Sequence, residues 1–447
     1  IKAAGDPNCL LNLGNGVCAA SDSSGNYTHN WNGQRDILGA VQRHNLFVFL
    51  NHDLGDGREL FAEYGQYQSE YNGNRHSVSH FSSVKFVVPA TNPYNFTGKA
   101  LLMDNYRFVD AGARVVDNDK QTDRYLVGVR GQTDDGWDWE SAASYSVAEA
   151  FDVTHNRVSN TLMDALLHRT DETAYNPFNG GGVYQTGFVS HNPVDYTPGG
   201  IGPALVDAYR ANERTMTTLD FRMSKPDVFT ITGGDVGMAF GVEARNDTFM
   251  DDRDPRLDGT IVFTERRTNG QLSTSAGDTY PYVSDLANSS PTPDNDGARN
   301  VNSVYLEFDV PLVSPEMNIP VVEQFDLQLA YRQEAYSDFE GTGVPRVAFG
   351  WVVNDILKIR GSQQDTFRAP NMITINEQMV VRNNTRNDAA TLYAVGLGID
   401  TDDSDGRYSV QRQAMGSSKL IAEESENSTV GLVLQPTDNL TITYDVW

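Results

Sequence analysis

Hydrophobic and polar residues alternate along many segments of this chain with a period of two. In the segment 137–147, one face carries Trp137, Trp139, Ala143, Tyr145 and Val147, and the other carries Asp138, Glu140, Ser144 and Ser146. Because successive side chains of a strand point to opposite faces, this pattern predicts a strand with one apolar face. A soluble strand usually has about 5 to 6 residues, whereas a tilted strand needs about 9 to 11 residues to cross a bilayer. The length of the segment therefore favours a transmembrane β-barrel.

The same alternation predicts strands in pairs, and each pair is joined by a short turn. The predicted pairs are 41–51 with 58–69, 124–131 with 137–148, 215–223 with 236–249, 304–313 with 325–335, 346–353 with 356–363, and 428–434 with 440–446. Segments rich in Gly and Asp, such as 53–57 and 133–136, are typical of hairpin turns.

Long polar segments separate these pairs, at about 70–122, 151–213, 250–300 and 366–427. Most connections in compact soluble domains have about 4 to 6 residues. Short turns at one end and long loops at the other are typical of outer-membrane barrels. The alternative is a soluble secreted β-sandwich or propeller, in which the apolar face of each strand would be a core.

Composition and charge exclude one class of partner and one class of membrane protein. The chain has 447 residues and a formal net charge of −26 at pH 7. Neutralising phosphates needs clustered Lys and Arg, so this charge argues against nucleic acid as a partner. The sequence has no run of about 18 apolar residues, so a membrane protein of this sequence would have to be a closed barrel and not a helical one.

Cysteines and acidic segments suggest little further chemistry. Cys9 and Cys18 are close in sequence and predict one disulfide that closes a loop, with two free thiols as the alternative. The aspartate-rich segments 294–297 and 402–406 do not complete an EF-hand loop, so we expect solvated acidic loops and assign no metal ligands, with calcium binding as the alternative. We expect His44 and His52 to be wall or turn residues. No cofactor and no enzymatic activity are expected, because the sequence has no Gly-x-Ser-x-Gly, His-Glu-x-x-His or phosphate-binding glycine motif.

Several charged residues lie on the polar faces of the predicted strands. They are Glu140, Glu243, Arg245, Glu307, Arg332 and Arg360. An arginine that faces lipid near the bilayer midplane costs about 2 to 4 kcal/mol, so we place this set on the lumen side. Two roles stay open for it, an ion-pair lattice between the wall and a plug, or contact with a ligand.

Four segments resemble a known family. The segment 360–371 ends in Phe367, Arg368, Ala369, Pro370 and Asn371, and it resembles the S-x-x-F-R-A-P-N segment in the barrel of TonB-dependent outer-membrane receptors. The segment 420–447 resembles the family pattern L-x-P-E-x-S-x-N…G…L-x-x-x-x-D-x-W, with Ala422 in place of the proline. N-P-Y-N at 92–95 and N-P-F-N-G-G at 176–181 resemble loop motifs of the large proteobacterial branch. The likeness runs from about residue 37 to the end of the sequence.

The resemblance implies part of a barrel of about 22 strands that an N-terminal plug closes. The chain supplies about twelve predicted strands and neither the plug nor the TonB-contacting box, and Trp447 is out of phase with the apolar residues before it. We therefore expect an internal piece of a receptor, with residues 1–36 as an extracellular loop that holds Cys9 and Cys18, and 37–447 as barrel wall with long extracellular loops.

The function that the resemblance implies is active uptake in the Gram-negative outer membrane. Outer loops would capture a scarce small-molecule ligand, namely an iron-siderophore, cobalamin, an oligosaccharide or a peptide-like compound. The TonB complex would then act on the receptor's own plug domain, and the barrel would be surrounded by outer-membrane lipid. The loop aromatics Tyr175, Phe178 and Tyr184 are candidates for stacking against that ligand. A passive porin or an adhesin barrel is the alternative.

Overall fold

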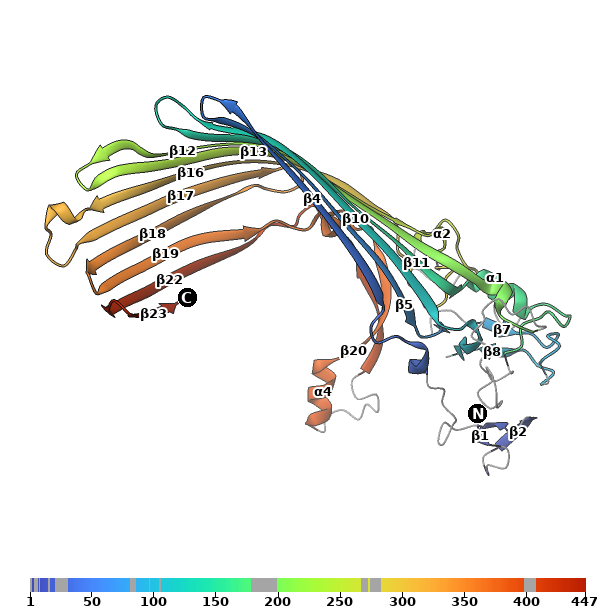
Figure 1. Ribbon diagram of the computed structural model, residues 1–447. Helices are drawn as coiled ribbons and strands as arrows, with labels where there is room; N and C mark the ends of the chain where they lie inside the picture. Colours follow the sequence, from blue (N-terminus) through green and yellow to red (C-terminus); the bar gives the residue numbers. More distant parts are fainter. Residues whose placement is uncertain are drawn as a thin grey trace.

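The computed structural model describes residues 2–3, 7, 9–14, 17–20, 31–80, 86–95, 97–103, 106–177, 199–266, 272–273, 283–397 and 407–447. Twelve strands form one curved antiparallel sheet, and β4 and β23 are its two edges (Figure 1). The strands are β4 Ala40–Gly55, β5 Arg58–Arg75, β10 Arg114–Gln132, β11 Asp138–Val158, β12 Leu205–Ile231, β13 Gly234–Arg253, β16 Asn295–Val313, β17 Gln324–Tyr336, β18 Thr342–Asn354, β19 Leu357–Arg368, β22 Glu423–Thr437 and β23 Leu440–Val446. The sheet has the form of a partial barrel that is not closed.

All twelve predicted strands are confirmed, and each predicted pair forms a hairpin. The turn between β4 and β5 has positive φ at Asp56 (54°) and Gly57 (70°), as expected of an Asp-Gly hairpin turn. Long connections lie at the other end of the sheet, at 76–113, 159–204, 254–294 and 369–422. The prediction of a long loop between every two pairs is wrong at one place, because only residues 337–341 join β17 to β18.

The sheet has one apolar and one polar face. Residues directly opposite each other in paired strands share a face, so the register connects Val127, Ala143 and Leu219 across three neighbouring strands. Leu219 is 58% exposed, and Val242 and Val304 are each 50% exposed. In a β-sandwich these side chains would be buried, so the fold of the described residues is not the soluble alternative.

The strands are longer than a bilayer requires. A strand rises about 3.3 Å per residue, so the 19 residues of β10 extend about 60 Å, against about 30 Å of hydrocarbon. On the apolar face of β10, Tyr125 and Val127 lie near the short-turn end, and Asp123, Asp119 and Asp117 follow toward the long loops. The part of the sheet nearest the long loops, which we call its upper part, therefore lies outside the membrane-spanning zone.

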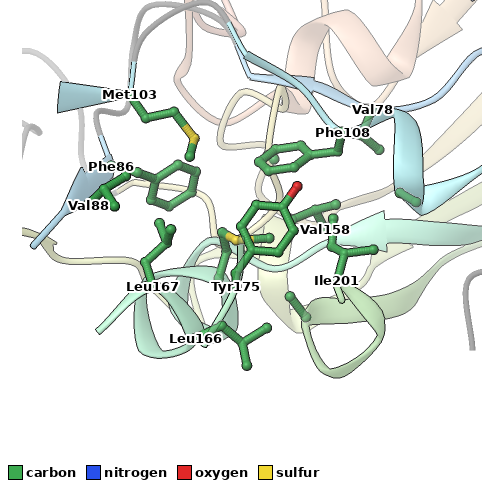
Figure 2. Packing of buried hydrophobic residues seen from close by; sticks show 14 of the residues in the cluster. Val78, Phe86, Val88, Met103, Phe108, Val158, Leu166, Leu167, Tyr175 and Ile201 are labelled. Atoms are coloured by element: carbon green, nitrogen blue, oxygen red, sulfur yellow. The ribbon is translucent and has the colours of Figure 1, made fainter. Parts of the chain in front are cut away.

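Three of the long connections pack into one small core beside the end of the sheet, which we call the loop cluster. It includes β7 (Phe86–Val88), β8 (Leu101–Met103) and α1 (Asn160–Leu167) (Figures 1 and 2). Its core consists of Val78, Phe86, Val88, Met103, Phe108, Ala111, Val158, Met163, Leu166, Leu167, Tyr175, Ile201, Ala204, Phe263 and Ala287. The rings of Phe86 and Phe108 meet edge to face with centroids 6.4 Å apart, and those of Phe86 and Phe263 are 5.9 Å apart. Three connections that are distant in sequence therefore share one core.

The remaining elements are short. They are β1 Lys2–Ala3, β2 Cys9–Gly14, β3 Val17–Ala20, β6 Ser79–His80, β9 Tyr106–Arg107, β14 Glu265–Arg266, β15 Leu272–Ser273, β20 Val380–Asn387, β21 Arg407–Ala414, α2 Pro255–Asp258, α3 Met372–Asn376, α4 Ala389–Gly396 and the 3₁₀ turns Trp31–Gln34, Val109–Ala111, Gly202–Ala204 and Pro315–Met317. In the described part of the chain, none of the helices is both long and apolar enough to cross a membrane.

Candidate functional site

The six charged residues singled out from the sequence share the polar face of the sheet, which we call the charged face. Cross-strand register connects Glu140, Glu243, Arg245, Glu307, Arg332 and Arg360 to this one face. It is the face opposite Val127 and Val304. A closed barrel that turns its apolar face to lipid would turn the charged face to its lumen.

A row of alternating charges crosses four strands of the charged face near the short turns. Glu59, Arg130, Glu140 and Arg222 lie directly opposite one another in β5, β10, β11 and β12. Arg130 pairs with Glu59 at 3.0 Å and Arg222 with Glu140 at 2.6 Å. The row lines an open groove of about 690 Å³. Wall charges here are satisfied by neighbouring wall charges.

Two other predicted wall charges are also paired within the sheet. Arg360 holds both carboxylate oxygens of Asp445, at 2.8 and 2.9 Å. Arg332 contacts Glu334 at 2.6 Å. In both contacts the partner is another residue of the wall. The lattice between wall and plug, and contact with a ligand, both stay predictions.

The segment 367–371 has a structural role that the sequence did not reveal. Arg299 of β16 donates hydrogen bonds to both carboxylate oxygens of Asp338, at 2.8 to 2.9 Å, and another to the carbonyl oxygen of Pro370 at 2.8 Å. The side chain of Asn371 accepts a hydrogen bond from the Ile373 amide at 3.0 Å and so caps α3. The segment is thereby tied to the upper end of β16. Sequence reasoning missed Arg299 because its partners come from two other loops.

The predicted ligand-stacking aromatics have different positions. Tyr175 is fully buried in the loop cluster, where its ring packs against Phe108 (Figure 2). In this structure it is a core residue with no surface for a ligand. Phe178 and Tyr184 lie outside the described residues. So do the segment 402–406 and the side chains of Cys9 and Cys18, and the disulfide stays a prediction.

A polar network accompanies Tyr175 in the loop cluster. Its hydroxyl donates to Asp110 Oδ1 at 3.2 Å and lies 2.9 Å from the hydroxyl of Tyr106. Asp110 keeps some exposed surface, but its Oδ2 atom is shielded from solvent and has no hydrogen-bond partner among the residues that the structure describes. Burial raises the pKa of Asp110 to about 6, although the hydrogen bond from Tyr175 acts in the opposite direction.

No metal centre is found among the residues described: they contain no group of three or more His, Cys, Asp or Glu side chains placed to hold an ion.

Comparison with known proteins identifies the family. The family model described as "TonB dependent receptor-like, beta-barrel" matches residues 155–447. This chain belongs to the TonB-dependent receptors. Comparison with curated proteins gave no match.

Three solved structures of receptors and importers are similar to this chain. A mutant of the ferric enterobactin receptor of Pseudomonas aeruginosa is 14% identical, with a TM-score of 0.50 over 94% of this chain and 44% of that chain. The siderophore receptor PirA of Pseudomonas aeruginosa is 12% identical (TM-score 0.40, 91% and 51% coverage), and the RagAB peptide importer is 10% identical (TM-score 0.48, 91% and 39% coverage). The chain thus spans about half or less of the length of these relatives.

Proposed function

We propose that this chain forms part of the wall and the outer loops of a receptor for TonB-energised uptake in the Gram-negative outer membrane. The observation that carries the proposal is the exposed apolar face of a twelve-stranded sheet in a chain of this family. Long loops at one end provide the surface for ligand capture, and short turns occupy the other end. The division into a loop over 1–36 and a barrel over 37–447 belongs to the same proposal.

The partners follow from the two faces. Outer-membrane lipid would cover the apolar face, and the receptor's own plug would fill the charged face, where the TonB complex would act on it. The ligand is a scarce small molecule, for which an iron-siderophore, cobalamin, an oligosaccharide and a peptide-like compound are the candidates. Ferric enterobactin and peptides are named for the structural relatives. Their low identity leaves the choice open.

A test that needs no known ligand separates active uptake from a passive porin. We expect the full-length receptor to give no steady conductance in a planar lipid bilayer and to bind the C-terminal domain of TonB in a pull-down experiment. A plugged barrel is closed to ions until TonB acts on it. An open channel without TonB binding would favour the porin and refute the proposal.

A further inference from the structure

One turn at the short-turn end of the sheet has an unusual composition. Residues 314–323 join β16 to β17 and include the 3₁₀ turn Pro315–Met317 (Figure 1). The stretch 317–322 has the sequence Met-Asn-Ile-Pro-Val-Val, and we call it the apolar turn. It contains no charged residue, although 21% of the residues of the chain are charged. Aspartates lie in the turns of four other hairpins at this end, namely Asp56, Asp134, Asp355 and Asp438.

The side chains at the tip of the apolar turn are not packed into the protein. Val321 is 68% exposed and Ile319 is 39% exposed. Pro320, between them, is also exposed. A single exposed apolar residue is common on protein surfaces, but a contiguous exposed apolar patch marks a contact with another molecule or a membrane. Three successive apolar residues at the tip of one turn therefore indicate a surrounding other than water.

Val321 is held in an uncommon backbone conformation. Its φ is 64°, in the left-handed region, where a β-branched residue is rarely found. Such a conformation persists only where neighbouring contacts maintain it. Here Nε1 of Trp351 donates a hydrogen bond to the carbonyl oxygen of Val321 at 3.0 Å. The amide of Glu323 donates to the carbonyl oxygen of Val352 at 2.9 Å. Strand β18 thereby fixes the apolar turn while the Val321 side chain stays exposed.

The hydrogen bond from Trp351 places the apolar turn beside the apolar face of the sheet. Trp351 lies directly opposite Phe325 in β17, and Phe325 shares the apolar face with Leu329. The rings of Phe325 and Phe349 stack on this face, with centroids 6.0 Å apart. Tryptophan is enriched where lipid meets water, because its ring is apolar and its N–H is polar. The apolar turn therefore continues the apolar face at its short-turn end.

We propose that the apolar turn inserts into the phospholipid of the periplasmic leaflet and that Trp351 positions it there. Apolar side chains at the boundary between headgroups and acyl chains gain free energy by leaving water. The lack of charge in the turn fits lipid better than a periplasmic protein, because protein interfaces have a polar rim. This inference rests on the proposed function, which places lipid on the apolar face and the short turns in the periplasm.

Fluorescence of a labelled turn tests the proposal. The full-length receptor, in a cysteine-free background, carries Val321→Cys labelled with nitrobenzoxadiazole, in nanodiscs of phosphatidylethanolamine and phosphatidylglycerol. The replaced side chain is exposed, so folding should be unchanged. We expect emission at shorter wavelength, quenching by nitroxide-labelled lipid and loss of quenching by iodide, because the fluorophore would lie among acyl chains.

The matched control is Asp134→Cys, which puts the same label at an exposed position in the turn between β10 and β11. We expect iodide, but not the nitroxide-labelled lipid, to quench this label. Equal quenching by iodide at both positions would overturn the proposal. A label at position 321 that iodide reaches until the C-terminal domain of TonB is added would assign the turn to a protein partner, and would overturn the proposal as well.

Trp351→Phe tests how the turn is positioned. This variant keeps an aromatic ring on the apolar face but removes the N–H donor to Val321. We expect the emission of the label at position 321 to shift to longer wavelength and its quenching by iodide to increase. Unchanged emission and quenching would overturn the positioning role of Trp351.

The two proposals fail separately. A receptor that conducts freely and does not bind TonB, but whose label at position 321 is quenched by lipid, would refute only the proposed uptake function. A closed, TonB-binding receptor whose label at position 321 is quenched by iodide would refute only the insertion of the apolar turn.

Discussion

His155 Nδ1 lies 2.9 Å from a carboxylate oxygen of Asp207, and the opposite ring nitrogen lies 3.0 Å from Asp117. The imidazole thus connects β11 to the strands on both sides, above the membrane-spanning zone. Burial lowers the pKa of His155, but the hydrogen bonds to Asp207 and Asp117 oppose it and raise the pKa above its usual value. A protonated ring between two carboxylates is the favoured state.

This geometry predicts that the upper end of β11 is less stable at higher pH. A raised pKa means that the contribution is complete below pH about 6.5 and is lost as the pH rises through the folded-state pKa. The ring is 35% exposed, so the effect should be about 1 kcal/mol or less. Amide hydrogen exchange of β11, corrected for intrinsic rates, measures it. His155→Gln should abolish the dependence, and the same dependence in that variant would contradict the assignment.

Asp110 predicts a second pH dependence, in the loop cluster. Its pKa of about 6 lies above the usual 3.8, so the folded cluster binds more protons than the unfolded chain between these values. Stability should therefore fall by about 1 to 3 kcal/mol as the pH rises from about 4 to above 6. Pulsed proteolysis of the loops at several pH values measures this change. Asp110→Asn should flatten the profile, and an unchanged slope would exclude Asp110 as its source.

Replacing Arg299 should destabilise the protein more than replacing Arg222, although each arginine forms an ion pair. The Arg299 side chain is 7% exposed and holds Asp338 and the Pro370 carbonyl, whereas that of Arg222 is 60% exposed. Removing one partner of a buried pair leaves a buried charge, so Arg299→Ala should cost about 3 kcal/mol or more. Arg222→Ala should cost about 1 kcal/mol or less. Hydrogen exchange of β16 and β12 measures each. Equal costs would refute the structural role of Arg299.

The alternation predicts the wall strands well because one face of each strand contacts lipid and the other contacts water. It underestimates the length of the strands, because beyond the bilayer both faces contact water and the alternation is lost. The strand predicted at 215–223 extends over Leu205–Ile231, and β10 continues from Arg124 back to Arg114. Above the bilayer both faces meet water, so residues such as Asp117 and Asp119 interrupt the apolar period without ending the strand.

The loop cluster and the pairing of Arg75 with Arg114 could not be predicted for a different reason. Phe86, Phe108 and Phe263 come from separate connections, and each connection alone appears as a polar loop. The sequence therefore predicts a surface aromatic at Tyr175, whereas the structure shows a core residue. Arg75 and Arg114 become neighbours only through the register of β5 and β10. Contacts of this kind depend on strand order, which a single sequence does not reveal.

Leu219 and Thr218 provide the most direct test of the two-faced wall. They are adjacent in β12 and point to opposite faces, and Leu219 is 58% exposed beside Ala143. Leu219→Arg would place a charge against hydrocarbon at a cost of about 2 to 4 kcal/mol, so we expect less receptor in the outer-membrane fraction and a lower folding yield in detergent or lipid. Thr218→Arg, the matched control, would add the same charge to the charged face and should fold normally. If both variants inserted equally well, or if only Thr218→Arg failed, the assignment of the apolar face to lipid would be wrong.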